Sequence, residues 1–129
     1  MKELRTAADV LEAARQQRAL VFIWVSWSEH ARKARVVVEK LFESWNSRHP
    51  DLPVRCYLAD LSEQEGEVWD EMKEWLEYEG RSADLLMFSG IGPLLWVRRG
   101  RIVMQGGPFE VPFENLEAAS LAVWQRQGS

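Results

Sequence analysis

The sequence predicts an α/β protein of three layers, in which helices cover both faces of a central mixed sheet of about four strands. Segments with helical and strand-like spacing alternate along most of the chain. Residues 19–25 form an uninterrupted apolar run rich in β-formers, which is typical of a central strand covered on both faces. Two further apolar runs, at 94–97 and 102–104, flank a turn at Arg99-Gly100 and predict a β-hairpin.

The first half of the chain predicts helix, strand, helix and strand in that order. Thr6 and Asp9 open a helix that continues to about residue 18. The apolar strand leads to Ser28, the expected N-cap of a long helix that ends near residue 46. Residues 54–60 predict a second strand. We expect these two strands to be parallel, because a long helix joins them.

The second half of the chain is less regular. Ser62 and Glu65 form a capping-box pattern that predicts a helix, which we expect to end at Gly80. Residues 81–92 predict neither helix nor strand. The hairpin then adds an antiparallel pair, and a closing helix is predicted from Pro112 to about residue 124.

Composition limits the classes of protein and partner. The 129 residues are 47% hydrophobic and contain no repeat or long linker, which predicts one domain over residues 1–129. The formal net charge is −4, and the basic residues are scattered among acidic ones, so no nucleic-acid partner is expected. The charged N-terminus does not resemble a signal peptide, and no apolar run is long enough to cross a bilayer. We therefore expect a cytoplasmic protein without a membrane partner.

Several features resemble the thioredoxin family. The order of elements is similar over almost the whole chain, from about Thr6 to Gln127. Where this family has Trp-Cys-Gly-Pro-Cys-Lys, residues 27–32 of this chain read Trp-Ser-Glu-His-Ala-Arg. The tryptophan is kept, but Ser28 and Ala31 stand where the family has its two redox cysteines.

Other positions also correspond to landmarks of this family, with the family's residue either kept or replaced. The resemblance implies that Pro93, before the hairpin, is in the cis form and faces Ser28. A glycine near the family's substrate groove has its counterpart in Gly106 or Gly107. Phe22 stands in place of the family's buried aspartate, so we expect core packing where the family has a proton relay. The family's own first strand is expected to be missing or absorbed into the N-terminus.

The resemblance implies a non-catalytic, thioredoxin-like protein without the CxxC motif that binds a peptide or a partner protein. Family members hold extended peptides through backbone hydrogen bonds beside the cis proline, a mode that needs no cysteine. Trp27 is expected to be partly exposed and to anchor the peptide, whereas the other six tryptophans are expected to be structural. The expected peptide-binding groove consists of Trp27, Ser28, Glu29, His30, Ala31, Gly92, Pro93, Gly106 and Gly107.

Other readings remain open. An enzyme with different chemistry would use the helix N-terminus at Ser28 to hold an anionic or glutathione-like ligand. The single cysteine, Cys56, would act as a redox sensor or form an intermolecular disulfide. We expect no Ser28–His30 catalytic pair, because residues two apart on a helix point in different directions. No cofactor or metal is expected, and a homodimer remains a further possibility beside the expected protein or peptide partner.

Overall fold

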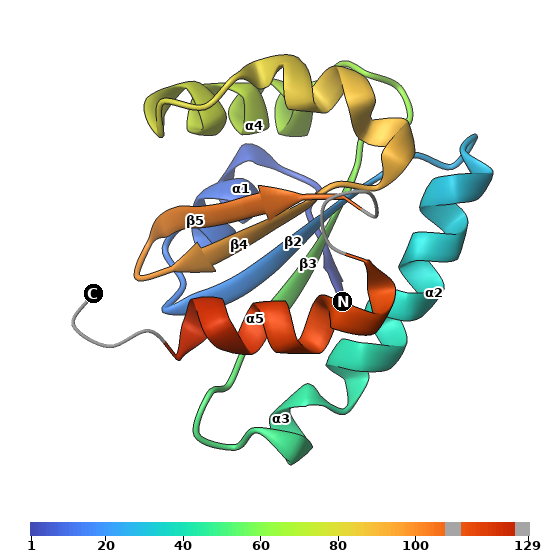
Figure 1. Cartoon of the computed structure of the whole chain (residues 1–129). Helices are drawn as coiled ribbons and strands as arrows, with labels where there is room; N and C mark the ends of the chain where they lie inside the picture. The colour runs from blue at the N-terminus through green and yellow to red at the C-terminus, as the bar shows by residue number, and fades with distance from the viewer. Residues whose placement is uncertain (108–111, 126–129) are drawn as a thin grey trace.

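The structure is a computed structural model that describes residues 1–107 and 112–125. Its strands are β1 (Lys2–Glu3), β2 (Arg18–Trp24), β3 (Arg55–Asp60), β4 (Leu94–Arg98) and β5 (Arg101–Gly106). Its helices are α1 (Ala7–Ala14), α2 (Glu29–Glu43), α3 (Trp45–Arg48), α4 (Glu67–Tyr78) and α5 (Leu116–Trp124), and two 3₁₀ helices are η1 (Ala83–Ile91) and η2 (Phe113–Asn115). Figure 1 shows how these elements are arranged.

The strands form one mixed sheet in the order β1-β3-β2-β4-β5. Strands β2 and β3 are parallel, while β4 is antiparallel to both β2 and β5. The predicted parallel pair and the hairpin are thereby confirmed. The expected sheet of about four strands has a fifth, because the N-terminus contributes β1, which runs parallel to β3. It is followed by a hydrogen bond of 2.8 Å from Leu4 N–H to the Leu58 carbonyl.

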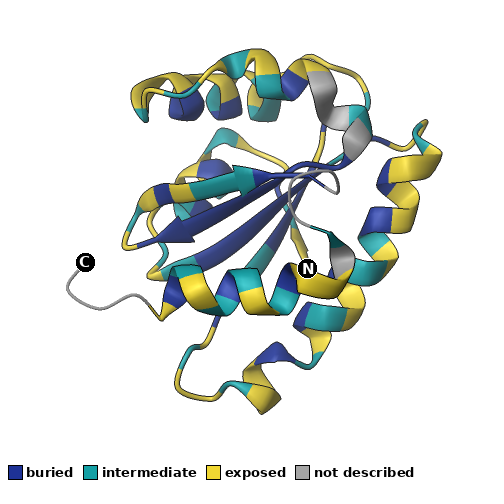
Figure 2. Ribbon diagram, in the orientation of Figure 1, coloured by how far each residue is buried: buried dark blue, intermediate teal, exposed yellow. Residues whose placement is uncertain are grey.

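Strand β2 lies at the centre of the sheet and is buried on both faces. Its residues Ala19, Val21 and Ile23 belong to a core with α1, α4 and η1, whereas Leu20 and Phe22 belong to a second core with α2, α3 and α5. This division follows from the alternation of side chains along a strand. The result is the expected three layers, with the buried strands running between the exposed outer faces of the helices (Figures 1 and 2).

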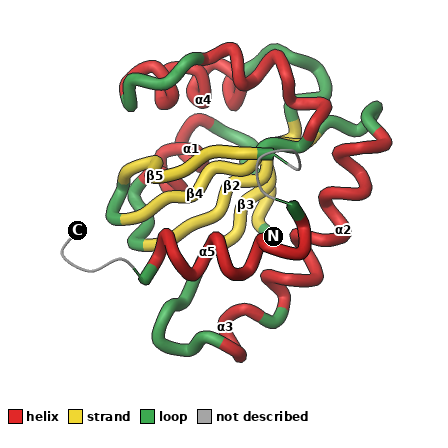
Figure 3. The backbone as a smooth tube through the Cα atoms, viewed as in Figure 1, coloured by secondary structure: helices red, strands yellow, loops and turns green. Residues whose placement is uncertain are grey.

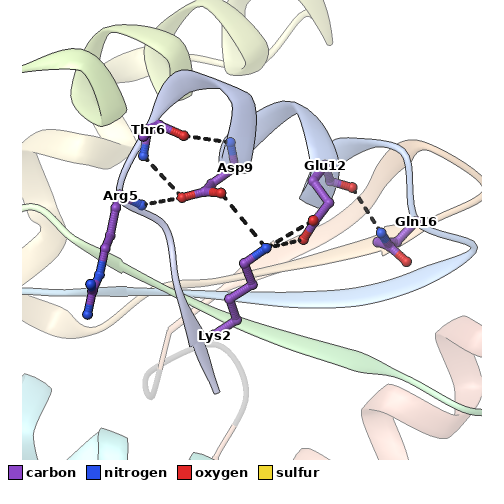
Figure 4. Close-up of polar contacts among 6 residues, drawn as sticks. All are labelled: Lys2, Arg5, Thr6, Asp9, Glu12 and Gln16. Atoms are coloured by element: carbon purple, nitrogen blue, oxygen red, sulfur yellow. Dashed lines mark hydrogen bonds and ion pairs between the residues drawn. The ribbon is translucent and has the colours of Figure 1, made fainter.

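The start of α1 is capped as the sequence predicts (Figure 4). The Thr6 hydroxyl accepts a hydrogen bond of 3.1 Å from Asp9 N–H, and the Asp9 carboxylate accepts one of 3.2 Å from Thr6 N–H. The Asp9 carboxylate also accepts the Arg5 N–H, and these backbone bonds hold the Asp9 pKa below its ordinary value. Lys2 lies 2.9 Å from the Glu12 carboxylate and joins β1 to α1.

The region after β3 differs from the prediction. Helix α4 begins at Glu67 with Gly66 as N-cap, so the Ser62–Glu65 capping box is wrong. The Ser62 hydroxyl is engaged elsewhere: it donates to the Asp60 carboxylate and accepts from the Ser26 N–H. The segment that predicted no element forms η1, the 3₁₀ helix that leads from α4 to β4 (Figure 3).

Candidate functional site

The loop from β2 to α2 leads into the residues expected to stand in place of the thioredoxin redox motif, and both of its ends are fixed. Ser26 N–H donates to the Ser62 hydroxyl at 2.8 Å, and Arg32 donates to the Ser26 carbonyl at 3.1 Å. Leu61 N–H also donates to the Trp24 carbonyl at 2.9 Å. The loop is therefore tied both to the end of β3 and to the first turn of α2.

Ser28 is the N-cap of α2, as the sequence predicts. Its hydroxyl accepts a hydrogen bond of 3.1 Å from Ala31 N–H and donates one of 2.5 Å to the Gly90 carbonyl. The proton that a general base would have to remove is thus already bonded to a carbonyl. Glu29 and His30 follow on the exposed first turn, and Ala31 is fully buried. Ser28 therefore caps the N-terminus of α2 and links it to η1.

The step from Gly92 to Pro93 contradicts the expectation of a cis proline, because the described residues contain no cis peptide bond. The chain turns here through Gly92, whose φ is +67°, and continues into β4 with a trans bond, the form that X–Pro steps favour. A Cβ on Gly92 would lie 3.2 Å from the Ala34 Cβ and 3.6 Å from Phe22. Gly92 and Pro93 are both buried, and the Pro93 carbonyl accepts the Ile23 N–H at 2.9 Å.

Trp27 is the exposed part of the site, with 60% of its surface accessible. The edge of its indole lies against Gly90, where an added Cβ would be 3.3 Å from two ring carbons. Met87, which is 61% exposed, precedes Gly90 by three residues. Because residues three apart eclipse on a 3₁₀ helix, Met87 and Gly90 share one side of η1. We call Trp27, Met87 and Gly90 the Trp27–Met87 surface.

The structure divides the nine expected groove residues by accessibility. Trp27, Glu29 and His30 are exposed and Ser28 is half-buried. Gly106 pairs with Leu94, which brings it beside the Gly92–Pro93 step, but Gly106 and Gly107 are both buried. Sequence reasoning missed Met87 and Gly90, because residues 81–92 had no recognisable element. The one available signal was the apolar run at 85–88 before a glycine.

The one thiol of the chain, Cys56, lies outside this site. Cys56 lies on β3, where burial raises the pKa of its thiol to about 12, so the nucleophilic thiolate is disfavoured. Among residues 1–107 and 112–125, no three His, Cys, Asp or Glu side chains come together as metal ligands. Within those same ranges, no helix is both long and apolar enough to cross a bilayer.

Solved structures of thioredoxins share this arrangement. Thioredoxin O2 from Arabidopsis thaliana superposes with a TM-score of 0.63 at 16% identity, covering 95% of this chain and 93% of its own. Fasciola hepatica thioredoxin gives 0.55 at 17% identity, covering 95% and 99%. Desulfothioredoxin from Desulfovibrio vulgaris Hildenborough gives 0.50 at 17% identity, covering 92% and 96%.

These likenesses establish the fold alone: the chain has an α/β thioredoxin-like fold. By sequence, no family model and no curated protein matches it. With one cysteine, the chain has no CxxC pair on this fold.

Proposed function

We propose that this chain is a non-catalytic binding domain that holds an extended, apolar peptide segment of a partner protein on the Trp27–Met87 surface. The observation that carries the proposal is the exposure of Trp27 at the end of a loop that backbone and side-chain hydrogen bonds hold in place. A large aromatic side chain that is already ordered loses little conformational freedom on binding, and such residues commonly dominate binding energy.

The mode of binding differs from strand addition at a cis proline. The Pro93 carbonyl already accepts the Ile23 N–H, and Gly92 and Pro93 are buried. Side-chain contact with the Trp27 indole is therefore the main anchor. Met87 adds a second apolar contact, since a flexible thioether adapts to differently shaped partners.

The alternative of an enzyme that holds an anion or glutathione at Ser28 has no observation in its favour. The Ser28 hydroxyl already accepts the hydrogen bond of the Ala31 N–H, so this donor is not available to an anion. The carboxylate of Glu29, in the same first turn, would also repel an anion. Thiol–disulfide exchange within the chain would need a second thiol, and Cys56 is the only one.

An array of short, immobilised peptides of varied sequence tests the proposal. We expect the labelled protein to bind a subset enriched in large apolar residues. For a peptide chosen from that subset, Trp27→Ala should weaken binding measured by calorimetry by about tenfold or more, because a central aromatic anchor is lost.

Tyr78→Ala is the matched control, since Tyr78 is also an exposed aromatic residue, 87% accessible, but lies on α4. This variant should bind the same peptides as the unmodified protein. Peptide binding that survives Trp27→Ala, or that is lost equally in Tyr78→Ala, would rule out the Trp27–Met87 surface. An array on which the protein binds nothing would rule out peptide binding itself.

A further inference from the structure

A cavity of about 550 Å³ lies at the end of the sheet where β2 begins and β4 ends. The start of β2, the turn after α3, the turn between β4 and β5, and the end of α5 all contribute to it. Its volume falls within the range of small-molecule sites, roughly 300–1,000 Å³. Leu52 and Trp124 supply apolar wall, and the remaining lining is mostly polar.

The cavity is strongly basic although the whole chain carries a net charge of −4. Arg18, Arg48, Arg98 and Arg99 line it together with His49, and one lining residue, Asp51, is acidic. Guanidinium groups match phosphate and carboxylate groups in geometry and bind them through paired hydrogen bonds. The lining thus fits an anionic ligand.

The sheet and its hairpin turn fix where three of these arginines lie. Arg18 and Arg98 are direct partners across β2 and β4, so their side chains project from the same face of the sheet. Arg99 and Gly100 have φ values of +52° and +78°, as a two-residue hairpin turn between the paired residues Arg98 and Arg101 requires. The strand register and the hairpin turn together bring these three arginines to one end of the sheet, at the cavity.

The backbone around the cavity holds these side chains in position. Arg99 N–H donates to the Gln17 carbonyl at 2.8 Å, and Gly100 N–H donates to the Gln16 carbonyl at 3.1 Å. On the other side, Glu117 lies 3.0 Å from Arg48 and 2.7 Å from His49, which fixes both residues at the cavity rim. Glu117 thus neutralises part of the positive charge at the rim, that of Arg48.

We propose that this cavity binds a small polyanion that carries at least two phosphate or carboxylate groups. Such a ligand would bridge arginines from separate segments, Arg18 at the start of β2 and Arg99 in the hairpin turn. The site is independent of the Trp27–Met87 surface: the cavity adjoins Arg18 at the start of β2, whereas Trp27 follows the far end of that strand, roughly 20 Å away at the usual rise per residue.

Titration calorimetry with pyrophosphate and, separately, with citrate tests the proposal at low ionic strength in chloride buffer. We expect saturable one-to-one binding of at least one of the two anions. Arg18→Gln and Arg99→Gln should each weaken that binding by about tenfold or more, since each removes a charged hydrogen-bond donor. Binding of one anion alone would support the site and identify the preferred group.

Arg5→Gln is the charge-matched control, because the Arg5 side chain is 77% exposed and lies after β1, away from the cavity. It should change the affinity less than twofold. As a second readout, the indole N–H signal of Trp124 in ¹⁵N NMR spectra should shift during the titration, while that of Trp27 stays in place. Absence of saturable binding by both anions, or equal weakening by Arg5→Gln in folded protein, would overturn the proposal.

Discussion

Ser28 and Gly92 join the start of α2 to the segment that enters β4. The Ser28 hydroxyl reaches the Gly90 carbonyl, and Gly92 packs against Ala34. The cap role of Ser28 could be predicted, because it depends on residues next to it in the sequence. The contact of Gly92 could not, because its partners Ala34 and Phe22 are distant in the chain and only the fold brings them together.

We expect Gly92→Ala to destabilise the protein by about 2–4 kcal/mol. The new residue would keep a left-handed φ of +67° and would place its Cβ 3.2 Å from that of Ala34. Both effects oppose folding, because the buried site has little room to relax. Urea unfolding followed by tryptophan fluorescence measures the change.

Gly80→Ala separates these two effects. Gly80 also has a positive φ, +73°, but an added Cβ would meet nothing within 4 Å. This variant should therefore lose only about 1–2 kcal/mol, the cost of the backbone conformation. Equal losses in the two variants would mean that the contact between Gly92 and α2 is not tight.

At the scale of elements, α5 is joined to β4 through two buried indoles. Trp96 on β4 donates its Nε1–H to the Ser120 hydroxyl at 2.8 Å, and Trp124 on α5 donates to the Val97 carbonyl at 3.0 Å. The structural role expected for these tryptophans is confirmed. Their polar partners could not be predicted, because periodicity locates a buried face but does not pair the residues on it.

Ser120→Ala should lower the free energy of unfolding by about 1–3 kcal/mol, because it leaves the buried Trp96 N–H without an acceptor. Urea unfolding measures the loss. Ser47→Ala, an exposed serine on α3, is the control and should change stability by less than about 0.5 kcal/mol. A Ser120→Ala variant as stable as this control would show that the Trp96–Ser120 bond contributes nothing net.

Elements without a strong local pattern account for most of the differences from the prediction. Strand β1 has two residues, too few to show alternation, and depends on pairing with β3. Helix η1 is a 3₁₀ helix, which matches neither the 3.6 nor the 2.0 period. The cis form expected of Pro93 depends on the family resemblance alone, whereas here the chain turns at Gly92, whose φ is positive, without a cis bond.

At the scale of the whole molecule, the two candidate sites lie at opposite ends of the central sheet. The first is local in sequence around Trp27, so its main residue could be named in advance. The second could not, because Arg18, Arg48, Arg98 and Arg99 are scattered among acidic residues in the sequence. The fold collects them at one cavity, and scattered charge in a sequence therefore does not exclude a basic site.

Glu117 joins two of the segments that line this cavity. It links α5 to Arg48 and His49, which lie at the end of α3. The hydrogen bond with His49 and the charge of Arg48 hold the Glu117 pKa below its ordinary value of 4.5. A carboxylate whose pKa is lower in the folded state stabilises that state above the unfolded pKa. This stabilisation is lost as the pH falls through the folded value.

We therefore expect Glu117→Gln to be less stable than the unmodified protein at pH 7 by about 1 kcal/mol or less, because the ion pair is partly exposed. The difference should shrink as the pH falls below 4.5, where the unmodified carboxylate also becomes neutral. Urea unfolding across this pH range measures both curves. Glu77→Gln, at an exposed position on α4, should instead follow the unmodified curve throughout. A deficit in Glu117→Gln that stays constant down to pH 3 would mean that lost packing, rather than the charge of Glu117, causes it.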